Sequence, residues 1–379
     1  MVEWFAVGGA VRDMLLGRGF NDVDFSFRGS AKDFLQCFPS ARNTGRAFPI
    51  WLSSGVEYTE LEDNWEADFA ARDLTINACA MDAEGSLYAH PCFAEDMRNR
   101  ILRLASPHSI QDDPLRIFRI ARFYAAMPEF CIAPETLHAM RQFASASRAE
   151  IAAIPKERVA RELMRALSAP KPSNFLAALL LTDCLDPWFE EHARAASITA
   201  GPQPWHDNTV LEHTMQVMDR CAGHPLAVWM ALCHDLGKVL TRPEDLPHHY
   251  GHEKTGADLA RNLGERLGMP SRYIRASVVG TLCHMKGGVY GSLRAGTRRD
   301  LLVLVKNAGI MHDFWLLAGA DGNVDWEPAA LQDLQAMESV HLPKEWQGKG
   351  EESGRRLRNM QCEVMSRLPK PMPRKLRGA

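Results

Sequence analysis

The stretch between residues 7 and 25 constrains the fold of this chain most. It begins with VGGAVRD and, after a short run, continues with NDVDF. Gly8 and Gly9 separate an apolar segment from a helical pattern, so backbone N–H groups at a helix start can hold a phosphate there. Asp22 and Asp24 alternate with apolar residues, and on a strand both carboxylates then lie on one face. Such a pair repels itself unless a cation, usually a divalent metal, lies between the two groups.

Each half of this stretch also has an ordinary explanation. A Gly-Gly pair usually marks a turn, and Asp-x-Asp is often a solvated strand edge or loop. Together, with Arg12 and Asp13 behind the glycines, they indicate metal-assisted phosphoryl or nucleotidyl transfer. The combined pattern resembles the nucleotidyltransferase superfamily, and within it the class II tRNA nucleotidyltransferases and bacterial poly(A) polymerases.

The first hundred residues alternate strand and helix patterns. Strands are predicted at 4–7, 23–27, 48–52, 56–61 and 99–103, and helices near Gly9 and Ser30. With the resemblance, this predicts an α+β protein: a nucleotidyltransferase head with a mixed sheet, an all-α neck and an all-α HD domain. The expected domains are a head at 1–103, a helical base-recognition neck at 104–200, an HD domain at 201–330 and a basic tRNA-contacting tail at 331–379.

The resemblance implies a third catalytic carboxylate on the fourth predicted strand. Glu57 is the expected residue and Glu60 the alternative; without the resemblance, Glu57 would be an ordinary exposed strand charge. With Asp22 and Asp24, the third carboxylate would hold two Mg²⁺ ions. One ion would lower the pKa of the attacking tRNA 3′-hydroxyl, and the other would neutralise the triphosphate and the leaving pyrophosphate.

A second motif begins at Arg72-Asp73 and includes Asn77. It resembles the Arg-Arg-Asp-x-x-x-Asn motif that reads the ribose hydroxyls and triphosphate of the incoming nucleotide, with Ala71 in place of the first arginine. Carboxylate and amide groups suit a 2′-hydroxyl, because they accept from it or donate to it. Taken alone, Arg72 and Asp73 would be a surface ion pair of little energetic value.

The link between Glu57 and the second motif, residues 58–69, is short. In the resembled family, enzymes that build the complete CCA end usually have a longer flexible loop here, and enzymes with a shortened loop add only cytidines. Such a loop can act as a lid that reshapes the pocket from CTP to ATP. The alternative of CC addition, with a separate enzyme adding the adenosine, therefore stays open.

The segment Asp112-Asp113-Pro114-Leu115-Arg116 predicts a helix with an aspartate N-cap and a proline at its first position. Its plain interpretation is a capped amphipathic helix with a basic stripe. The resemblance implies a protein template for the base, in which Asp113 accepts from an exocyclic amino group and Arg116 donates to the adjacent ring acceptor. Cytosine and adenine present that pair of groups. By the same resemblance Arg119 would meet phosphate or base.

A separate group of histidines and aspartates follows a Gly-Pro-x-Pro boundary near residue 201. His213, His234, Asp235 and Asp321 suit a divalent metal, although each histidine alone would more often be ordinary. The set resembles the HD phosphohydrolase superfamily. That resemblance implies secondary roles for Lys238, His252 and His284 toward phosphate or a second metal, with Mg²⁺, Mn²⁺ or Ni²⁺ as the ion. Expected substrates are 2′,3′-cyclic phosphates, 2′-nucleotides or small phosphoesters.

Composition limits partners and location. The net charge is −3, so a nucleic acid must bind to local basic patches such as the arginines after residue 354; a solvated tail is the equal alternative. No apolar run is long enough for a membrane span, no signal peptide is predicted, and nine scattered cysteines indicate reduced thiols in the cytoplasm. The expected partners are tRNA, CTP and ATP, with no membrane; the oligomeric state is left open.

These observations predict a CTP- and ATP-dependent tRNA nucleotidyltransferase with an HD phosphohydrolase domain. Poly(A) polymerases of the resembled family lack the HD domain, which ranks them lower. A nucleotide-binding or RNA-binding protein that has lost catalysis is the alternative from another class. Intact Asp22, Asp24, Arg72 and Asp113 argue against it, and metal-dependent pyrophosphate release would distinguish the two.

Overall fold

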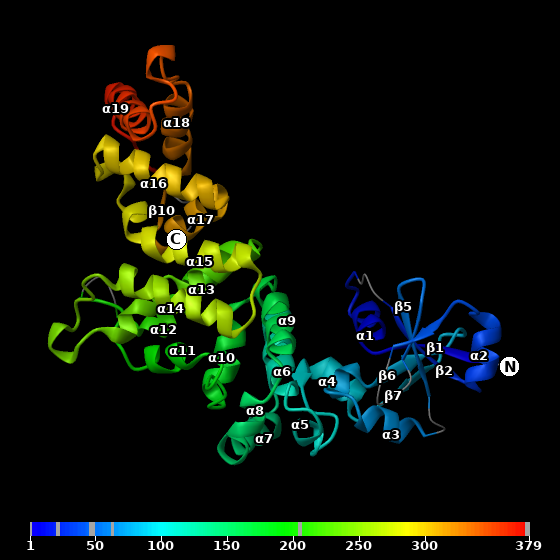
Figure 1. The fold of residues 1–379 in the computed structure, drawn as a ribbon. Coiled ribbons are helices and arrows are strands. Elements are labelled where there is room, and N and C mark those ends of the chain that lie inside the picture. Colours follow the sequence, from blue (N-terminus) through cyan, green and yellow to red (C-terminus); the bar gives the residue numbers. More distant parts are fainter. Residues whose placement is uncertain (1, 20–22, 45–49, 62–63, 204–206, 376–379) are drawn as a thin grey trace. The chain divides into compact units, whose positions relative to one another are not determined.

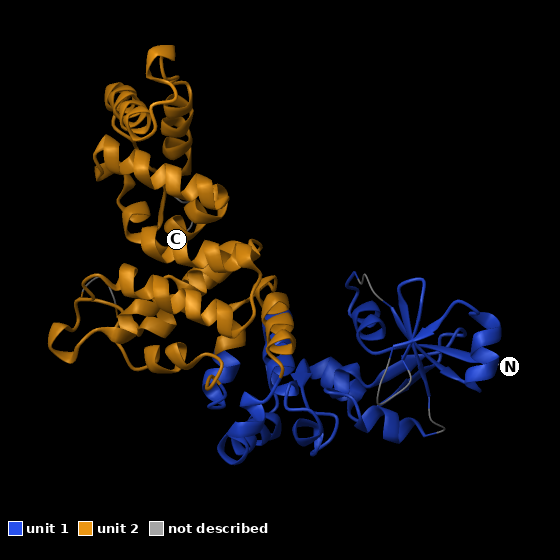
Figure 2. Cartoon of the chain, in the orientation of Figure 1, with its two compact units in different colours: residues 1–154, 177–184 blue, residues 155–176, 185–379 orange. Residues whose placement is uncertain are grey.

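The computed structural model describes residues 2–19, 23–44, 50–61, 64–203 and 207–375 (Figure 1). The chain forms two compact units (Figure 2). Unit 1 comprises residues 1–154 and 177–184, and unit 2 comprises residues 155–176 and 185–379. The domain limits proposed above near residues 103, 200 and 330 stay predictions.

Unit 1 contains the mixed sheet that the sequence predicts. Its strand order is β3-β4-β5-β2-β1-β6-β7, with β2 parallel to β5 and the other neighbours antiparallel. The predicted strands at 4–7, 23–27, 48–52 and 56–61 correspond to β1, β2, β4 and β5; residues 48 and 49 lie outside the described part. The strands are β1 (Glu3–Val7), β2 (Asp24–Arg28), β3 (Arg42–Asn43), β4 (Ile50–Ser53), β5 (Val56–Glu60), β6 (Cys79–Met81) and β7 (Leu87–Ala89).

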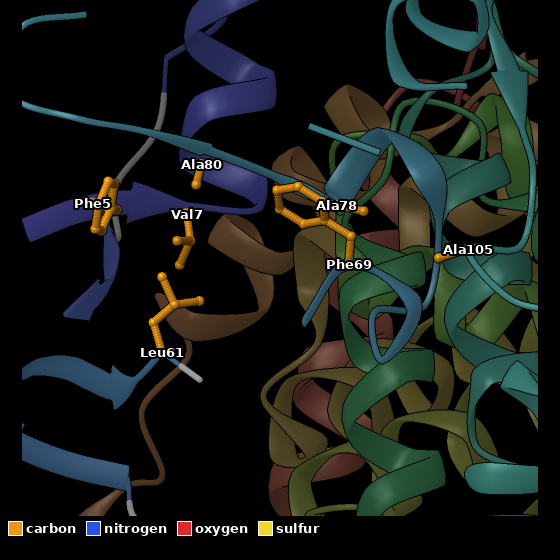
Figure 3. Close-up of a cluster of buried hydrophobic side chains, with 7 residues drawn as sticks. All are labelled: Phe5, Val7, Leu61, Phe69, Ala78, Ala80 and Ala105. Atoms are coloured by element: carbon orange, nitrogen blue, oxygen red, sulfur yellow. The ribbon is translucent and has the colours of Figure 1, made fainter. Parts of the chain in front are cut away.

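The two faces of this sheet pack against different helices. On one face, Phe27 stacks on Phe34 of α2 (Ala31–Cys37) with ring centroids 4.5 Å apart. On the other face, Phe5 and Val7 belong to a buried cluster that includes Phe69 of α3 (Trp65–Ala70) (Figure 3). Because side chains alternate along a strand, each face of the sheet presents its own apolar side chains to its own helix. Burying each large apolar side chain contributes about 1.5–3 kcal/mol.

The remaining elements of unit 1 include a second, small sheet of β8 with β9. The strand predicted over 99–103 is present but shorter, at Ile101–Leu102. Asn99 ends α4, and Arg100 has the left-handed φ of 58° that reverses the chain, so only two residues remain to pair with β9. These elements are α1 (Gly9–Leu15), α4 (Phe93–Asn99), β8 (Ile101–Leu102), α5 (Ser109–Asp112), α6 (Arg116–Ala126), β9 (Cys131–Ile132), α7 (Pro134–Ala146) and α8 (Arg148–Ala152).

The helix predicted to start at Asp113-Pro114 begins later, at Arg116. Asp113 is extended and ends α5 instead. Its carboxylate still accepts from the N–H of Leu115 at 3.2 Å, and its carbonyl accepts from the N–H of Arg116 at 3.0 Å. The aspartate therefore stabilises a turn before α6 rather than serving as the N-cap itself.

Unit 2 is built almost entirely of helices around α13, whose residues 226–233 are all buried. A helix that is apolar on every side belongs in a core.

No helix in the described part of the chain combines the length and the apolar character needed to cross a membrane. Helix α10 contributes to both units. The elements are α9 (Lys156–Leu167), α10 (Ser173–Leu181), α11 (Glu190–Ala195), α12 (Val210–Arg220), α13 (Pro225–Cys233), α14 (His252–Arg266), α15 (Ser271–Gly288), α16 (Ala295–Ala308), α17 (Met311–Gly322), β10 (Val324–Asp325), α18 (Glu327–Glu338), α19 (Glu351–Arg367) and β11 (Arg374–Lys375).

Candidate active sites

The second motif of the head forms a buried polar network around Asp73. This carboxylate, 6% exposed, accepts from Arg119 on α6 at 2.8 Å (Nε) and 2.5 Å (Nη2). Its other oxygen accepts from Nδ2 of Asn77 at 2.9 Å. Burial alone would raise the pKa of Asp73, but the charge of Arg119 and the bond from Asn77 outweigh it and hold this pKa below its ordinary value. Asp73 is therefore ionised, and its hydrogen bonds hold Asn77 and Arg119 in place.

Arg12 extends the same network to the glycine segment. Its guanidinium donates to Oδ1 of Asn77 and, at 2.9 and 2.8 Å, to the carboxylate of Asp13. Gly8 has a φ of +67°, and a Cβ placed on it would lie 3.8 Å from Nη1 of Arg72. A Cβ on Gly9 would lie 3.6 Å from Arg12. The structure thus brings together two glycines and two arginines, donors suited to a polyphosphate.

The sheet register separates the two candidates for the third carboxylate. Tyr58 pairs with Phe25 in the parallel register of β2 and β5, which places Glu57 beside Asp24. Both precede, by two residues, the pair Ser26 and Thr59, whose hydroxyls are 2.8 Å apart. Because side chains alternate along a strand, Asp24 and Glu57 share this face.

Glu60 belongs to the opposite face. It pairs with Phe27, whose side chain packs against α2. The alternation therefore favours Glu57 over Glu60 as the partner of Asp24. The other predicted carboxylate, Asp22, lies outside the described residues.

The predicted base-reading segment lies beside the second motif. Arg116 donates to the carbonyl and hydroxyl of Ser109 at 3.0 and 2.7 Å, and also to the carbonyl of Ala71. Residue 71 is where the resembled motif has its first arginine. Asp113 lies in the turn before α6, Arg116 is the first residue of α6, and Arg119, one turn further on, holds Asp73. Arg116 and Arg119 therefore connect the predicted base-reading segment to the motif around Asp73.

Sequence reasoning missed several residues that hold this site. Asp68 accepts from Arg72 at 3.2 Å, a helical i,i+4 pair that its spacing signals. Asp96, fully buried, accepts from Thr75 at 2.7 Å and from Nε of Arg103 at 3.0 Å. That contact joins residues far apart in the chain, and no local pattern indicates it.

The histidines and aspartates of the HD motif gather in one buried cluster in unit 2. Asp235, directly after α13, is its centre and is 2% exposed. One of its oxygens lies 3.3 Å from Nε2 of His234 and 3.7 Å from Nε2 of His213. His213 in turn lies 3.0 Å from Asp321 of α17. The four predicted ligands therefore meet, although His213 lies on α12, Asp321 lies on α17, and His234 and Asp235 directly follow α13.

The two predicted secondary histidines face the other oxygen of Asp235. Nε2 of His252 lies 3.3 Å and Nε2 of His284 lies 3.6 Å from it. Two groups of three possible metal-ligating side chains thus occur among the described residues, and they share Asp235. Lys238 donates to the first oxygen at 2.7 Å and to the carbonyl of Ala200 at 2.8 Å.

The ring orientation of three of these histidines fits metal ligands. The Nδ1 atoms of His234, His252 and His284 lie 2.7, 2.6 and 2.7 Å from the backbone carbonyls three residues earlier. Since a carbonyl only accepts, each Nδ1 carries a proton, and Nε2 is the nitrogen that faces the cluster. The Nε2 atoms of His252 and His284 are only 3.2 Å apart. Two neutral rings with Nδ1 protonated would face each other with lone pairs, which a proton on one Nε2 or a bound cation compensates.

Burial and neighbouring charges shift the pKa values of three groups in the cluster. Burial would lower the pKa of His234, but Asp235 and Asp321 raise it to about 9. Burial and the nearby His234 lower the pKa of His284 to about 4. Burial alone would raise the pKa of Asp235, whereas His234 and Lys238 hold it well below its usual range. Asp235 is therefore ionised, and the cluster offers a carboxylate with imidazole nitrogens to a divalent ion.

Two glycines bring the cluster together. A Cβ on Gly237 would lie 2.0 Å from the carbonyl oxygen of His252, and a Cβ on Gly256 would lie 2.9 Å from the N of Gly237. Neither glycine has a positive φ. They are needed because the turn after Asp235 presses directly on the backbone of α14, which delivers His252 to the cluster.

Three family models match the chain. They describe a poly A polymerase head domain at residues 4–54, a probable RNA- and SrmB-binding site of polymerase A at 129–195, and an HD domain at 210–289.

Similar solved structures share the fold. A Bacillus stearothermophilus CCA-adding enzyme in complex with CTP has a TM-score of 0.68 at 20% identity, covering 96% of this chain and 89% of that chain. A Thermotoga maritima CCA-adding enzyme complexed with tRNA has a TM-score of 0.67 at 17% identity, covering 97% and 88%.

Sequence relatives share most of the chain. The multifunctional CCA protein of Pseudomonas fluorescens Pf-5 is 36% identical over 79% of this chain and 78% of its own length. That of Halorhodospira halophila is 30% identical over 98% of each. The chain therefore belongs to the multifunctional CCA protein family.

Proposed function

We propose that unit 1 adds cytidine and adenosine to the 3′ end of tRNA from CTP and ATP, with release of pyrophosphate. The observation that carries the proposal is the continuous network from Arg12 through Asn77 and Asp73 to Arg119, next to a carboxylate face. Asp24 pairs with Val7, which directly precedes Gly8, so the strand of Asp24 adjoins the glycine segment of this network. Membership of the multifunctional CCA protein family supports the same reaction.

Each group in this site has a proposed task. Arg12 and Arg72, with the backbone at Gly8 and Gly9, hold the triphosphate, while Asp73 and Asn77 orient the ribose. Asp113 and Arg116 read the base, and Arg119 keeps Asp73 ionised and placed. Asp22, Asp24 and Glu57 would hold Mg²⁺, which supplies charge neutralisation and a more acidic 3′-hydroxyl. The described pair, Asp24 and Glu57, fits this role because both lie on one sheet face.

Extension of a tRNA that lacks its CCA end tests this proposal. The tRNA is incubated with CTP alone, ATP alone and both, and products are resolved to single nucleotides. Two cytidines followed by one adenosine support complete CCA addition. A halt after two cytidines with ATP present would assign the short 58–69 link to a CC-adding enzyme, and a long run of adenosines would indicate a poly(A) polymerase. Absence of extension and of pyrophosphate release would contradict the proposal.

We further propose that the Asp235 cluster is a metal-dependent phosphohydrolase site. The Nε2 atoms of His252 and His284 carry this proposal, because they lie 3.2 Å apart beside one oxygen of Asp235, an arrangement that fits a divalent cation such as Mg²⁺, Mn²⁺ or Ni²⁺. A bound metal makes its water a better nucleophile. In hydrolysis the water oxygen forms a new P–O bond, the ester P–O bond breaks, and the leaving oxygen takes up a proton. Lys238 is placed to contact a phosphate oxygen.

We also propose the four domains given above, a cytoplasmic location, and contact of the C-terminal tail with tRNA. Helix α19 carries Arg355, Arg356, Arg358 and Arg367. Arg358 is held by Asp300 of α16 at 2.6 Å. The predicted extended end forms β11, which pairs with β10. Contacts of these arginines with a phosphate backbone would weaken as salt rises.

A further inference from the structure

Residues 368–375, which we call the strap, return to the segment that follows Asp321 of the HD cluster. β11 pairs with β10 in antiparallel register, and Arg374 lies opposite Asp325. Nη2 of Arg374 lies 2.7 Å from Oδ2 of Asp325, which is the more buried partner of the two. Because β10 begins three residues after Asp321, the strap holds the chain close to a candidate metal ligand.

Trp326, the residue after β10, connects this segment to the helix that carries His284. Its Nε1 donates to the carbonyl of Gly288 at 3.0 Å, and Gly288 ends α15 one turn after His284. A Cβ on Gly291 would overlap the ring of Trp326 and would lie 3.0 Å from the carbonyl oxygen of Pro371 in the strap. The missing side chain at Gly291 therefore lets the indole and the strap approach the same place.

A cavity underlies the first part of the strap. It has a volume of about 280 Å³ and lies between residues 368–372 and the start of α18. The far end of the strap, by contrast, is paired with β10 and held by the ion pair of Arg374 with Asp325. Because 73% of the Arg374 side chain is exposed, this ion pair contributes little to global stability. Its effect is local, on the position of β10.

The two ends of this chain of contacts lie on different sides of the HD cluster. Asp321 lies 3.0 Å from Nε2 of His213, whereas Nε2 of His284 lies 3.6 Å from Oδ1 of Asp235. Metal–ligand distances tolerate changes of only about 0.2 Å. The ends of α17 and α15 must therefore keep their places for Asp321 and His284 to serve one site.

We propose that Trp326 and Arg374 are positioning residues of the HD site. The strap holds β10 through Arg374, and Trp326 ties β10 to the end of α15, so that Asp321 and His284 keep their places in the cluster. This inference rests on the proposed metal-dependent function of that cluster. Since coupling between two sites is reciprocal, a bound metal must in turn stabilise the pairing of the strap with β10.

The metal affinity of matched variants tests the positioning role. Trp326→Phe keeps an aromatic ring and removes the donor to Gly288, whereas Arg374→Ala removes the ion pair with Asp325. Each should weaken the binding of Mn²⁺ to the full chain, measured by calorimetry, by about threefold to tenfold, as changes along a chain of contacts do. Arg374→Lys should recover most of the affinity, because it restores the positive charge opposite Asp325.

Lys306→Ala is the matched control for these variants. It removes an ion pair between α16 and Glu338 of α18 in the same unit, and it should leave the affinity for Mn²⁺ unchanged. An affinity equal to that of the control in either Trp326→Phe or Arg374→Ala would overturn the proposal.

Hydrogen exchange tests the reciprocal effect without an activity assay. Mn²⁺ should slow amide exchange in the strap of the unmodified protein and of Lys306→Ala, and it should slow this exchange much less in Trp326→Phe. A merely structural role would lower the melting temperature of Trp326→Phe and leave the protection of the strap by Mn²⁺ unchanged, and that result would contradict the proposal.

Failure of the proposed metal site has a different signature. If the unmodified protein binds none of Mn²⁺, Ni²⁺ and Mg²⁺ in calorimetry, the metal-dependent function itself fails, and this inference fails with it. If the unmodified protein binds Mn²⁺ and the variants bind it equally well, only the positioning role fails.

Discussion

Asp73 shows how one buried charge can organise a site at the scale of a single residue. Its carboxylate accepts hydrogen bonds from Arg119 of α6 and from Asn77 of its own motif. Asn77 in turn accepts a hydrogen bond from Arg12. An ionised carboxylate in this position is stable only because these donors compensate for its lost hydration. The same bonds that stabilise the fold therefore hold the proposed nucleotide-binding groups in place.

This arrangement predicts a pH-dependent cost for Asp73→Asn. The folded pKa of Asp73 lies below the unfolded value of 3.8, so its ionised form stabilises the fold above that pH, and this stability is lost as the pH falls through the folded pKa. Hydrogen bonds to a charged group are worth about 1.5–3 kcal/mol, which is the expected loss at pH 7. Urea unfolding at pH 7, 5, 4 and 3 measures the difference between variant and unmodified protein. A difference that stays constant down to pH 3 would contradict the assignment.

The two glutamates of β5 provide a matched pair of variants. Glu57 shares the face of Asp24, whereas Glu60 lies on the α2 face. Glu57→Gln should lower the rate of nucleotide addition by at least about 100-fold, since even outer partners of a metal site cost 10–100-fold. Glu60→Gln should lower it little. Single-turnover extension of tRNA with Mg²⁺ measures both, and equal effects would show that the face of the strand does not decide the role.

Residue patterns predicted much of this site, within physical limits. Period-two alternation predicted the face of Asp24, whereas Glu57 was expected from the family resemblance, and only the sheet register shows that the two share a face. The contact of Asp96 with Thr75, by contrast, depends on how α4 packs and has no local signal. The same holds for the bond from Arg116 to the carbonyl of Ala71: backbone acceptors are present at every residue, so sequence does not say which one is used.

At the scale of elements, close packing of a turn against a helix assembles the HD cluster. Gly237→Ala would place a Cβ 2.0 Å from the carbonyl oxygen of His252. Overpacking of this kind costs about 1–3 kcal/mol, and it would displace His252 from Asp235. Expected are a lower stability in urea and weaker Mn²⁺ binding by calorimetry. Gly354→Ala has no such neighbour and should change neither; a Gly237→Ala protein with unchanged Mn²⁺ affinity would show that the turn does not position His252.

Element boundaries were the weaker part of the sequence prediction. Helix α6 begins at Arg116 rather than at Pro114, because Asp113 and Leu115 form a hydrogen-bonded turn first. A capping residue signals that a helix starts nearby but does not exclude an intervening turn. The predicted strand at 99–103 shortened because Arg100 adopts a left-handed conformation, which its residue type does not favour and which the packing of β8 with β9 stabilises.

At the scale of the whole molecule, the HD cluster joins elements spread over residues 213–321. Metal binding should therefore stabilise unit 2. A metal at 100 times its dissociation constant adds about 2.7 kcal/mol to the free energy of unfolding. Adding Mn²⁺ should raise the melting temperature measured by calorimetry, and a chelator should reverse the rise. Asp235→Asn should abolish the response, while His341→Ala, an exposed histidine outside the cluster, should keep it; a response that survives in Asp235→Asn would place the metal elsewhere.

The order of motifs along the chain predicted this architecture better than any single element. The head, the helical segment after it and the HD region follow one another in the sequence, and the family models match in the same order. The grouping into two compact units did not follow from the sequence. In that grouping α10 contributes to both units and residues 177–184 return to unit 1. Such a return depends on long-range packing, and composition does not reveal it.

The central claim is that one chain carries two chemically independent sites, and reciprocal variants test it most directly. Asp24→Ala and Asp235→Ala are each assayed for addition of cytidine and adenosine to tRNA and for hydrolysis of adenosine 2′,3′-cyclic phosphate. The expected result is that Asp24→Ala loses addition and keeps hydrolysis, whereas Asp235→Ala loses hydrolysis and keeps addition. Loss of both activities in either folded variant would contradict two independent sites.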